Sequence, residues 1–401
     1  MGKVNFNIGE GGLGRDLPTK DNYSGFLFDD AALPAGYTGG DTVKKVRTLE
    51  DAVTLGITVA LFPVAHYQIS EFFRIAEKLT GLAQGHLWVG FFDGGVESVA
   101  YDGTQLETIQ NVAEGEIRRV GVFLKGAFVS GFVTDSQTEA EALSVANKPL
   151  SVLLNADFSA LTLATLADMR ALASQRVSVN LGMDKGGTGG ALFVSESYSV
   201  TNLGAALAAK AFGNTHENIG WIGKFDQSSN DELNTIQFAT GEAFEDQSQT
   251  VLDDVNTKGY LYLKKEVGIT GTFQQDAPTA TLATSDYAYW ENQEVIDKAV
   301  RNVRTELLPL VNSPIYIATD TGKVSEASIE VFKTASFKAL DVLAQDGNIS
   351  TQENGELSPN SVIIDPNQDV LATSEIIVTI KIVPVGVART ITVNIGFTTQ
   401  I

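Results

Sequence analysis

The chain has 401 residues, of which 43% are hydrophobic and 19% charged, so it is long enough for two or three domains with separate cores. Its 49 acidic and 28 basic residues give a formal net charge of −21, the wrong sign for a protein that grips phosphate backbones, and favour solubility and mutual repulsion of subunits. The sequence contains no cysteine, which excludes disulfides, thiolate metal sites and cysteine catalysis.

The first 20 residues have the pattern of a free strand followed by a hinge. Val4, Phe6 and Ile8 alternate with polar residues, and residues 9–14 then match the spacing G-x-G-x-x-G. A dinucleotide site would need a helix after the glycines, but Pro18 follows with no helical period, so a flexible hinge is favoured. No apolar leader and no run of 18 apolar residues occurs, and we therefore expect a cytoplasmic protein that does not span a membrane.

Two helices and a strand are predicted next. Thr48 is a suitable N-cap for a short helix over TLEDAVTLGI, with Glu50 and Asp51 in its first turn. Apolar residues from Ile69 to Leu79 form one face of a second helix that ends before Gly81. Residues 87–92 are typical of a buried strand.

The middle of the chain alternates strand-like and helical patterns. The predicted strands are residues 119–124, 150–155, 176–181 and 219–225, and the predicted helices are residues 137–146, 160–173 and 203–211. This order is typical of an α/β unit with a mostly parallel sheet.

The last third predicts two long helices and a terminal hairpin. The helices cover about residues 291–308, ending at Pro309, and residues 325–345, ending near Gly347. Two strand-like runs then flank residues 384–386, and the second alternates apolar Ile391, Val393, Ile395 and Phe397 with polar residues. An exposed apolar edge of this kind promotes aggregation unless a partner pairs with it, so we expect this strand to have an acceptor.

The sequence predicts no catalytic, cofactor-binding or metal site. His66, His86 and His216 lie in no recognised ligand spacing and are interpreted as ordinary surface or core residues. The glycine-rich run from Lys185 to Gly190 is interpreted as a surface loop, with an anion-binding cradle as the alternative. No nucleophile motif is present, so an enzyme is not favoured.

A basic stripe interrupts the acidic background. Lys298, Arg301 and Arg304 recur at intervals of three on the helix over residues 291–308. One interpretation is a solvated face, supported by Glu294 one turn before Lys298. The other is a docking stripe for an acidic partner.

The C-terminal runs resemble a known family. DYAYWENQEVIDKAVRNVRTELLPLVNSPIYI, TGKVSEASIEVFKTASFKALDVLAQDGNIS, SVIIDPNQDVL and IIVTIKIVPVGVARTITVNIGF together are similar to the C-terminal core of contractile phage-tail sheath proteins, which also serve tail-like contractile injection systems. The resemblance covers about residues 255–401 and, more faintly, 40–100. Glu294 departs from it, because a basic residue is often seen there.

The resemblance implies a fold and an assembly. The fold would be α/β with a mixed α+β core: an N-terminal arm (1–20), the first part of the core (21–111), an outward-facing middle domain (112–225), the C-terminal core (226–387) and a C-terminal strand arm (388–401). The arms, with Val4, Phe6 and Ile8 at one end and Ile391 to Phe397 at the other, would add strands to sheets of neighbouring subunits.

The implied function is that of a sheath subunit that polymerises around an inner tube and contracts. Its partners would be copies of itself in stacked hexameric rings, the inner tail tube protein, and baseplate and terminator proteins, with no cofactor, no nucleic acid and no membrane insertion. Lys298, Arg301 and Arg304 would contact the tube. The particle, a virion tail or an injection system, would be assembled in the bacterial cytoplasm. The alternatives are a tail terminator or baseplate protein with the same core, and an α/β ligand-binding protein or enzyme.

Overall fold

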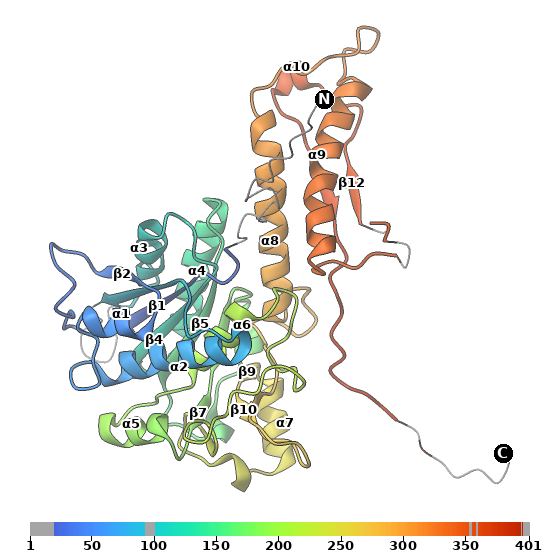
Figure 1. The fold of residues 1–401 in the computed structure, drawn as a ribbon. Coiled ribbons are helices and arrows are strands. Elements are labelled where there is room, and N and C mark those ends of the chain that lie inside the picture. The colour runs from blue at the N-terminus through green and yellow to red at the C-terminus, as the bar shows by residue number, and fades with distance from the viewer. Residues whose placement is uncertain (1–19, 93–100, 353–354, 358–359, 394, 396–401) are drawn as a thin grey trace, which may run out of the picture.

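The computed structural model describes residues 20–92, 101–352, 355–357, 360–393 and 395. It has three parts, which we name the body (residues 21–289), the limb (290–383) and the C-terminal segment (384–395). The body is a layered α/β unit, the limb is a pair of long helices with a small sheet, and the C-terminal segment runs away from the limb as an extended chain (Figure 1).

A seven-stranded sheet forms the centre of the body, in the order β2-β3-β1-β4-β5-β6-β9. All neighbours pair in parallel except β2, which lies antiparallel to β3 at one edge. Its strands are β1 (Ser24–Asp29), β2 (Val43–Val46), β3 (Leu87–Phe92), β4 (Arg119–Ala127), β5 (Ser151–Asp157), β6 (Val177–Asn180) and β9 (Tyr260–Leu261). The N-terminal ends of the parallel strands all lie along the same side of the sheet. Residues from distant parts of the sequence therefore come together there.

Helices cover both faces of this sheet, and the alternation along β1 shows how. Phe26 and Phe28 point into one core with α1, α2 and α6, whereas Leu27 points into a second core with α3 and α4. The helices of the body are α1 (Leu49–Thr54), α2 (Pro63–Thr80), α3 (Gln105–Val112), α4 (Ser130–Val145), α5 (Thr188–Glu196), α6 (Leu203–Phe212) and α7 (Gln249–Thr257).

Short elements complete the body. Two-stranded sheets join β7 (Gly182–Asp184) to β8 (Ile236–Phe238) and β10 (Leu263–Lys264) to β11 (Phe273–Gln274). Short 3-10 helices cover Leu163–Thr165, Met169–Leu172, Phe244–Asp246 and, in the limb, Leu308–Leu310.

Local signals in the sequence set the ends of the first two helices. Thr48 caps α1 through a reciprocal pair of hydrogen bonds with Asp51, and Gly81 ends α2 in the left-handed region at φ 79°. Both predicted helix ends are therefore confirmed. Helix α2 packs closely on α6, because a Cβ atom at Gly204 would lie 2.0 Å from the Gln68 carbonyl oxygen.

The limb consists of α8 (Trp290–Leu307), α9 (Glu326–Gln345), α10 (Val370–Thr373) and the antiparallel pair of β12 (Ser361–Ile363) and β13 (Thr379–Lys381). Two small apolar clusters hold α8 and α9 to the strands, one around Leu340 and Leu343 and the other around Ile329 and Phe332. Both long helices were predicted to within a residue at each end.

Two predicted elements of the body are wrong. Residues 160–173 form 3-10 turns and not an α-helix, since their buried apolar residues Leu163, Leu166 and Met169 recur every three residues. Residues 219–225 form turns and not a strand, because the Asn218 side chain accepts a hydrogen bond from the Gly220 amide and starts a turn there.

The terminal hairpin is also wrong as predicted. Strand β13 pairs with β12, and no strand is assigned to the C-terminal segment among its described residues. The predicted boundary at residues 111/112 does not divide the body either, since β1, β2 and β3 share one sheet with β4, β5 and β6. The outward position of residues 112–225 in an assembly remains a prediction.

Candidate functional site

Helix α8 connects the body to the limb, and its first half is buried in the body. Trp290 belongs to the body core, and its indole N–H donates to the Ser151 hydroxyl at 2.7 Å. The Glu294 carboxylate is bound by the Arg119 guanidinium at 2.8 and 3.0 Å, and the Ser151 hydroxyl donates to it at 3.2 Å. The residues of α8 that follow Ala299 are not buried, so the second half of this helix projects from the body into the limb (Figure 1).

Arg119 and Arg176 flank the starts of two parallel strands, which explains how they reach α8. Arg119 is the first residue of β4, and Arg176 directly precedes β6, so both lie at the edge of the sheet where parallel strands begin. Arg176 binds Asp297 through two nitrogens, at distances of 2.8 to 3.1 Å. Two buried, two-point ion pairs thus fix α8 against that edge.

Electrostatics keeps Glu294 ionised. Burial alone would raise the pKa of its carboxyl group, but the charges of Arg119 and Lys210 hold that pKa below its usual value. The Lys210 ammonium lies 3.6 Å from the Glu294 carboxylate and also donates to the carbonyl oxygens of Thr215 and Glu217.

The basic stripe does not form one continuous exposed face. Lys298 is only 5% exposed, and its ammonium lies 2.8 Å from both Asp21 and Asp346. Arg301 contacts Asp21 at 3.1 Å, whereas Arg304 is exposed. The interpretation of a solvated face is therefore wrong for Lys298, and Glu294, which had supported it, is itself buried. A tube contact by this stripe stays a prediction, and Arg304 is its most accessible member.

The C-terminal segment exposes an apolar face. Ile391, Val393 and Ile395 are 80%, 68% and 91% exposed, although their alternation is typical of a half-buried strand. Val4, Phe6, Ile8 and Phe397 lie outside the described residues. In the described part of the limb, β12 and β13 pair only with each other, so each presents an edge without a strand partner.

A single arginine ties the C-terminal segment to the body. The Arg389 Nε donates to Asp276 at 2.8 Å, its Nη2 donates to Glu291 at 2.5 Å, and its guanidinium carbon lies 3.4 Å from the centre of the Tyr289 ring. Beside it runs a groove of about 840 Å³ between residues 385–391 and residues 216–222 of the body.

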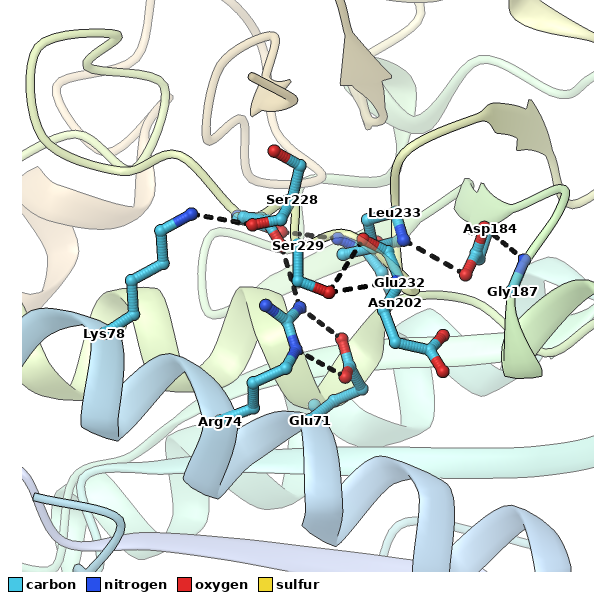
Figure 2. A network of polar contacts seen from close by, with 12 residues as sticks. Glu71, Arg74, Lys78, Asp184, Gly187, Asn202, Ser228, Ser229, Glu232 and Leu233 are labelled. Atoms are coloured by element: carbon cyan, nitrogen blue, oxygen red, sulfur yellow. Dashed lines mark hydrogen bonds and ion pairs between the residues drawn. The ribbon is translucent and has the colours of Figure 1, made fainter. Parts of the chain in front are cut away.

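The chain's own carboxylates hold the glycine-rich loop, and Figure 2 shows the contact of Asp184 with Gly187. Asp184 accepts hydrogen bonds from the amides of Gly186 and Gly187, both at 3.1 Å, and Glu232 accepts from the Thr188 amide at 3.0 Å. Nearby, Arg74 binds Glu71 in two-point fashion at 2.6 and 2.7 Å. Since these amides already have acceptors, the contacts favour a structural loop over an anion cradle.

Further chemistry is not apparent in the part of the chain that the structure describes. Within it, no three His, Asp or Glu side chains gather as metal ligands would. No helix in the same residues combines the length and apolar character needed to cross a bilayer.

The sequence analysis did not predict the role of Arg389. It also did not predict the buried junction between α8 and the body, which the pairs Glu294–Arg119 and Asp297–Arg176 form. The signal for the junction was the acidic spacing of Glu291, Glu294 and Asp297, three residues apart on the same helix as the basic stripe. For Arg389 the signal was a single charged residue between two apolar runs. Such a residue in an otherwise strand-like segment indicates a specific polar contact.

Solved structures of contractile assemblies share this fold over nearly the whole chain. A chain in the baseplate of the anti-feeding prophage (AFP) is 13% identical, with a TM-score of 0.63 over 95% of this chain and 94% of that one. The contracted helical sheath of the same prophage gives 14% identity and 0.61 over 94% and 93%. The contracted PVC sheath complex of an extracellular contractile injection system gives 13% identity and 0.62 over 94% and 92%.

The chain therefore has the fold of these baseplate and sheath structures, which confirms the α/β fold that the resemblance implied. Residues 286–401 match a family model described as the C-terminal domain of DUF2586. No match was found among curated protein sequences.

Proposed function

We propose that the chain is a structural subunit of a contractile tail sheath, which polymerises around an inner tube and contracts to drive that tube through a target envelope. The observation that carries the proposal is the likeness to the contracted AFP sheath over 94% of this chain and 93% of that one. A sheath does no bond chemistry. Its work comes from the free-energy difference between two packings of the same subunits, so the role is structural and not catalytic.

Strand addition would link the subunits. Ile391, Val393 and Ile395 present an unpaired apolar face, and β12 and β13 offer strand edges on the limb. Each main-chain hydrogen bond contributes about 0.5–1.5 kcal/mol net, and burial of the apolar face adds to this. A few paired residues would then hold neighbours together while the bodies move.

The partners follow from this role. They are copies of the same chain in stacked hexameric rings, an inner tail tube protein, and baseplate and terminator proteins. The net charge of −21 disfavours nucleic acid. The particle, a phage tail or an injection system, would be assembled in the bacterial cytoplasm without inserting the subunit into a membrane.

A second candidate is a baseplate or terminator protein built on the same core. It is favoured by the likeness to chains in the AFP baseplate, one of which covers 99% of this chain with a TM-score of 0.57 in the contracted state. Such a protein would close the end of a sheath and would not form long polymers by itself.

Electron microscopy of the purified chain tests the proposal. A sheath subunit is expected to form hollow striated cylinders, whereas discrete particles at all concentrations would favour the second candidate or a ligand-binding protein. Replacing Ile391, Val393 and Ile395 by Asp should abolish cylinders without unfolding the subunit. The matched control replaces Thr390 and Thr392, on the opposite side of the same run, and should leave cylinders intact.

A further inference from the structure

We propose that Asp276 and Tyr289 of the body, together with Glu291 at the start of α8, form a guanidinium-binding site that holds Arg389 and fixes where the C-terminal segment leaves its subunit. The site itself is a property of the single subunit. Its consequence for assembly rests on the proposed function.

The site surrounds the guanidinium on three sides. Asp276 and Glu291 each accept one hydrogen bond, from Nε and Nη2, and the Tyr289 ring lies against the planar face at 3.4 Å. Asn218 donates to Asp276 at 2.6 Å and to Glu291 at 3.0 Å, which holds the two carboxylates in place. This arrangement matches the planar, forked shape of an arginine side chain.

Charge explains why the site needs a cation. Glu291 is only 2% exposed and lies in the first turn of α8, and one of its carboxylate oxygens, Oε2, has no hydrogen-bond partner among the described residues. Burial raises the pKa of its carboxyl group, and the charges of Lys210 and Arg389 oppose that rise. Removing Arg389 would take one of these compensating charges from a buried carboxylate beside Asp276.

The position of Arg389 in the chain gives the site its role. Before it, the Ser350 amide donates to the Val383 carbonyl oxygen at 2.8 Å and ties the chain to the limb. After it, no described residue makes a hydrogen bond or ion pair, and the exposed apolar face begins at Ile391. Arg389 is thus the last tether, and it sets the direction of the segment that would reach a neighbour.

Spin-label distances in the unassembled subunit test the tether. Because the chain has no cysteine, Val393→Cys and Val267→Cys, both at exposed positions, can be labelled without background. With Arg389 present we expect a narrow distance distribution. Arg389→Ala should broaden it about twofold or more, and Lys381→Ala, which removes an exposed positive charge nearby in the sequence, should leave it unchanged. Equal widths with and without Arg389 would overturn the proposal.

The chemical class of the site has its own test. Arg389→Lys keeps the charge but lacks the planar fork that donates to both carboxylates while its face stacks on the ring, so its distribution should also be broader than that of the unmodified chain. In Arg389→Ala, methylguanidinium should raise the melting temperature more than methylammonium does at equal ionic strength. A lysine that restores the narrow distribution, or equal effects of the two cations, would show that no guanidinium site exists.

Microscopy of the same variants separates this inference from the proposed function. If the unmodified chain forms no cylinders, the sheath role fails while the distance result still decides the tether. If Arg389→Ala loosens the segment yet forms regular cylinders at normal yield, the tether has no role in assembly and the sheath role stands.

Discussion

The body differs in its apolar burial from the C-terminal region, by which we mean the limb and the C-terminal segment together. The body buries apolar side chains on both faces of one sheet, in two extensive cores. The limb has two small clusters, and the segment beyond it leaves Ile391, Val393 and Ile395 exposed. The contrast teaches that the body is built for its own stability, whereas the C-terminal region carries apolar surface that only another chain would cover.

The two regions meet through charge as well as apolar packing. Around the first half of α8, Glu294 and Asp297 bind Arg119 and Arg176 in a buried setting. Separating a buried ion pair costs free energy, because each charge would then stay out of water without its partner. We therefore expect this junction to hold the limb in one orientation on the body.

Breaking the junction should have the largest effect on stability. Glu294→Ala leaves Arg119 and Lys210 buried without their carboxylate and is expected to lower the free energy of unfolding by about 3–5 kcal/mol. Glu306→Ala is the control on the same helix, since Glu306 pairs with the exposed Lys338 and should cost no more than about 1 kcal/mol. Urea denaturation measures both. Similar losses for the two variants would contradict the account of the junction.

A double replacement sharpens the same comparison. Arg119→Met with Glu294→Leu removes both charges and keeps apolar volume, so it should destabilise the chain less than Glu294→Ala alone. Lys210 retains its carbonyl acceptors at Thr215 and Glu217 in that variant. A double variant less stable than Glu294→Ala would contradict the claim that buried charges left without a partner cause most of the loss in the single variant.

The body should show a pH dependence of its own at Glu232. Burial, which Asp184 reinforces, raises the pKa of Glu232 to about 7, although the Thr188 hydroxyl opposes the rise. Since the folded state binds this proton more tightly than the unfolded state, its contribution is complete below the unfolded pKa and is lost as pH rises through about 7. Glu232 is half-buried, so solvent screening should limit the effect to about 1 kcal/mol.

Melting curves from pH 4 to pH 8 measure this contribution. The difference in melting temperature between the unmodified chain and Glu232→Gln should change across that range, because glutamine cannot titrate. A constant difference would show that Glu232 keeps an ordinary pKa.

The smallest effect on folding is expected at Arg304. Arg304→Glu should leave the free energy of unfolding within about 0.5 kcal/mol, because the side chain is exposed. Lys298→Glu, by contrast, would place a carboxylate beside Asp21 and Asp346 and should destabilise the junction. If the stripe contacts an inner tube, Arg304→Glu should weaken cosedimentation with tubes most strongly at low salt. Unchanged binding at all salt concentrations would exclude Arg304 from that contact.

Local signals in the sequence were enough to predict many of the helices and strands. The two long limb helices were predicted because their apolar period and the end signals at Pro309 and Gly347 lie within the helices or next to them. Residues 160–173 were missed because a three-residue apolar repeat looks helical over so short a stretch. The hairpin was missed because β13 pairs with a strand before α10, a choice that no local pattern records.

The candidate site was harder to predict for the same reason. Arg119 and Glu294 are 175 residues apart, and only the parallel order of the sheet brings β4 to α8. The alternation of Ile391, Val393 and Ile395 was visible, but which residue tethers them depends on Asp276 and Glu291, which the sequence places far away. Periodicity in the sequence predicts which face of a helix or strand is apolar. Ion pairs between distant residues can be predicted only when the topology of the fold is known.

Cross-linking between subunits tests most directly the claim that the C-terminal segment pairs with a neighbour. With no native cysteine, Ile395→Cys on the segment and Ile363→Cys on β12 provide the only two thiols in the chain. In assembled material a short bismaleimide should give a ladder of dimers, trimers and longer species on a denaturing gel, while each single variant should give at most dimers. Monomer bands alone from intact cylinders of the double variant would contradict strand exchange at this edge.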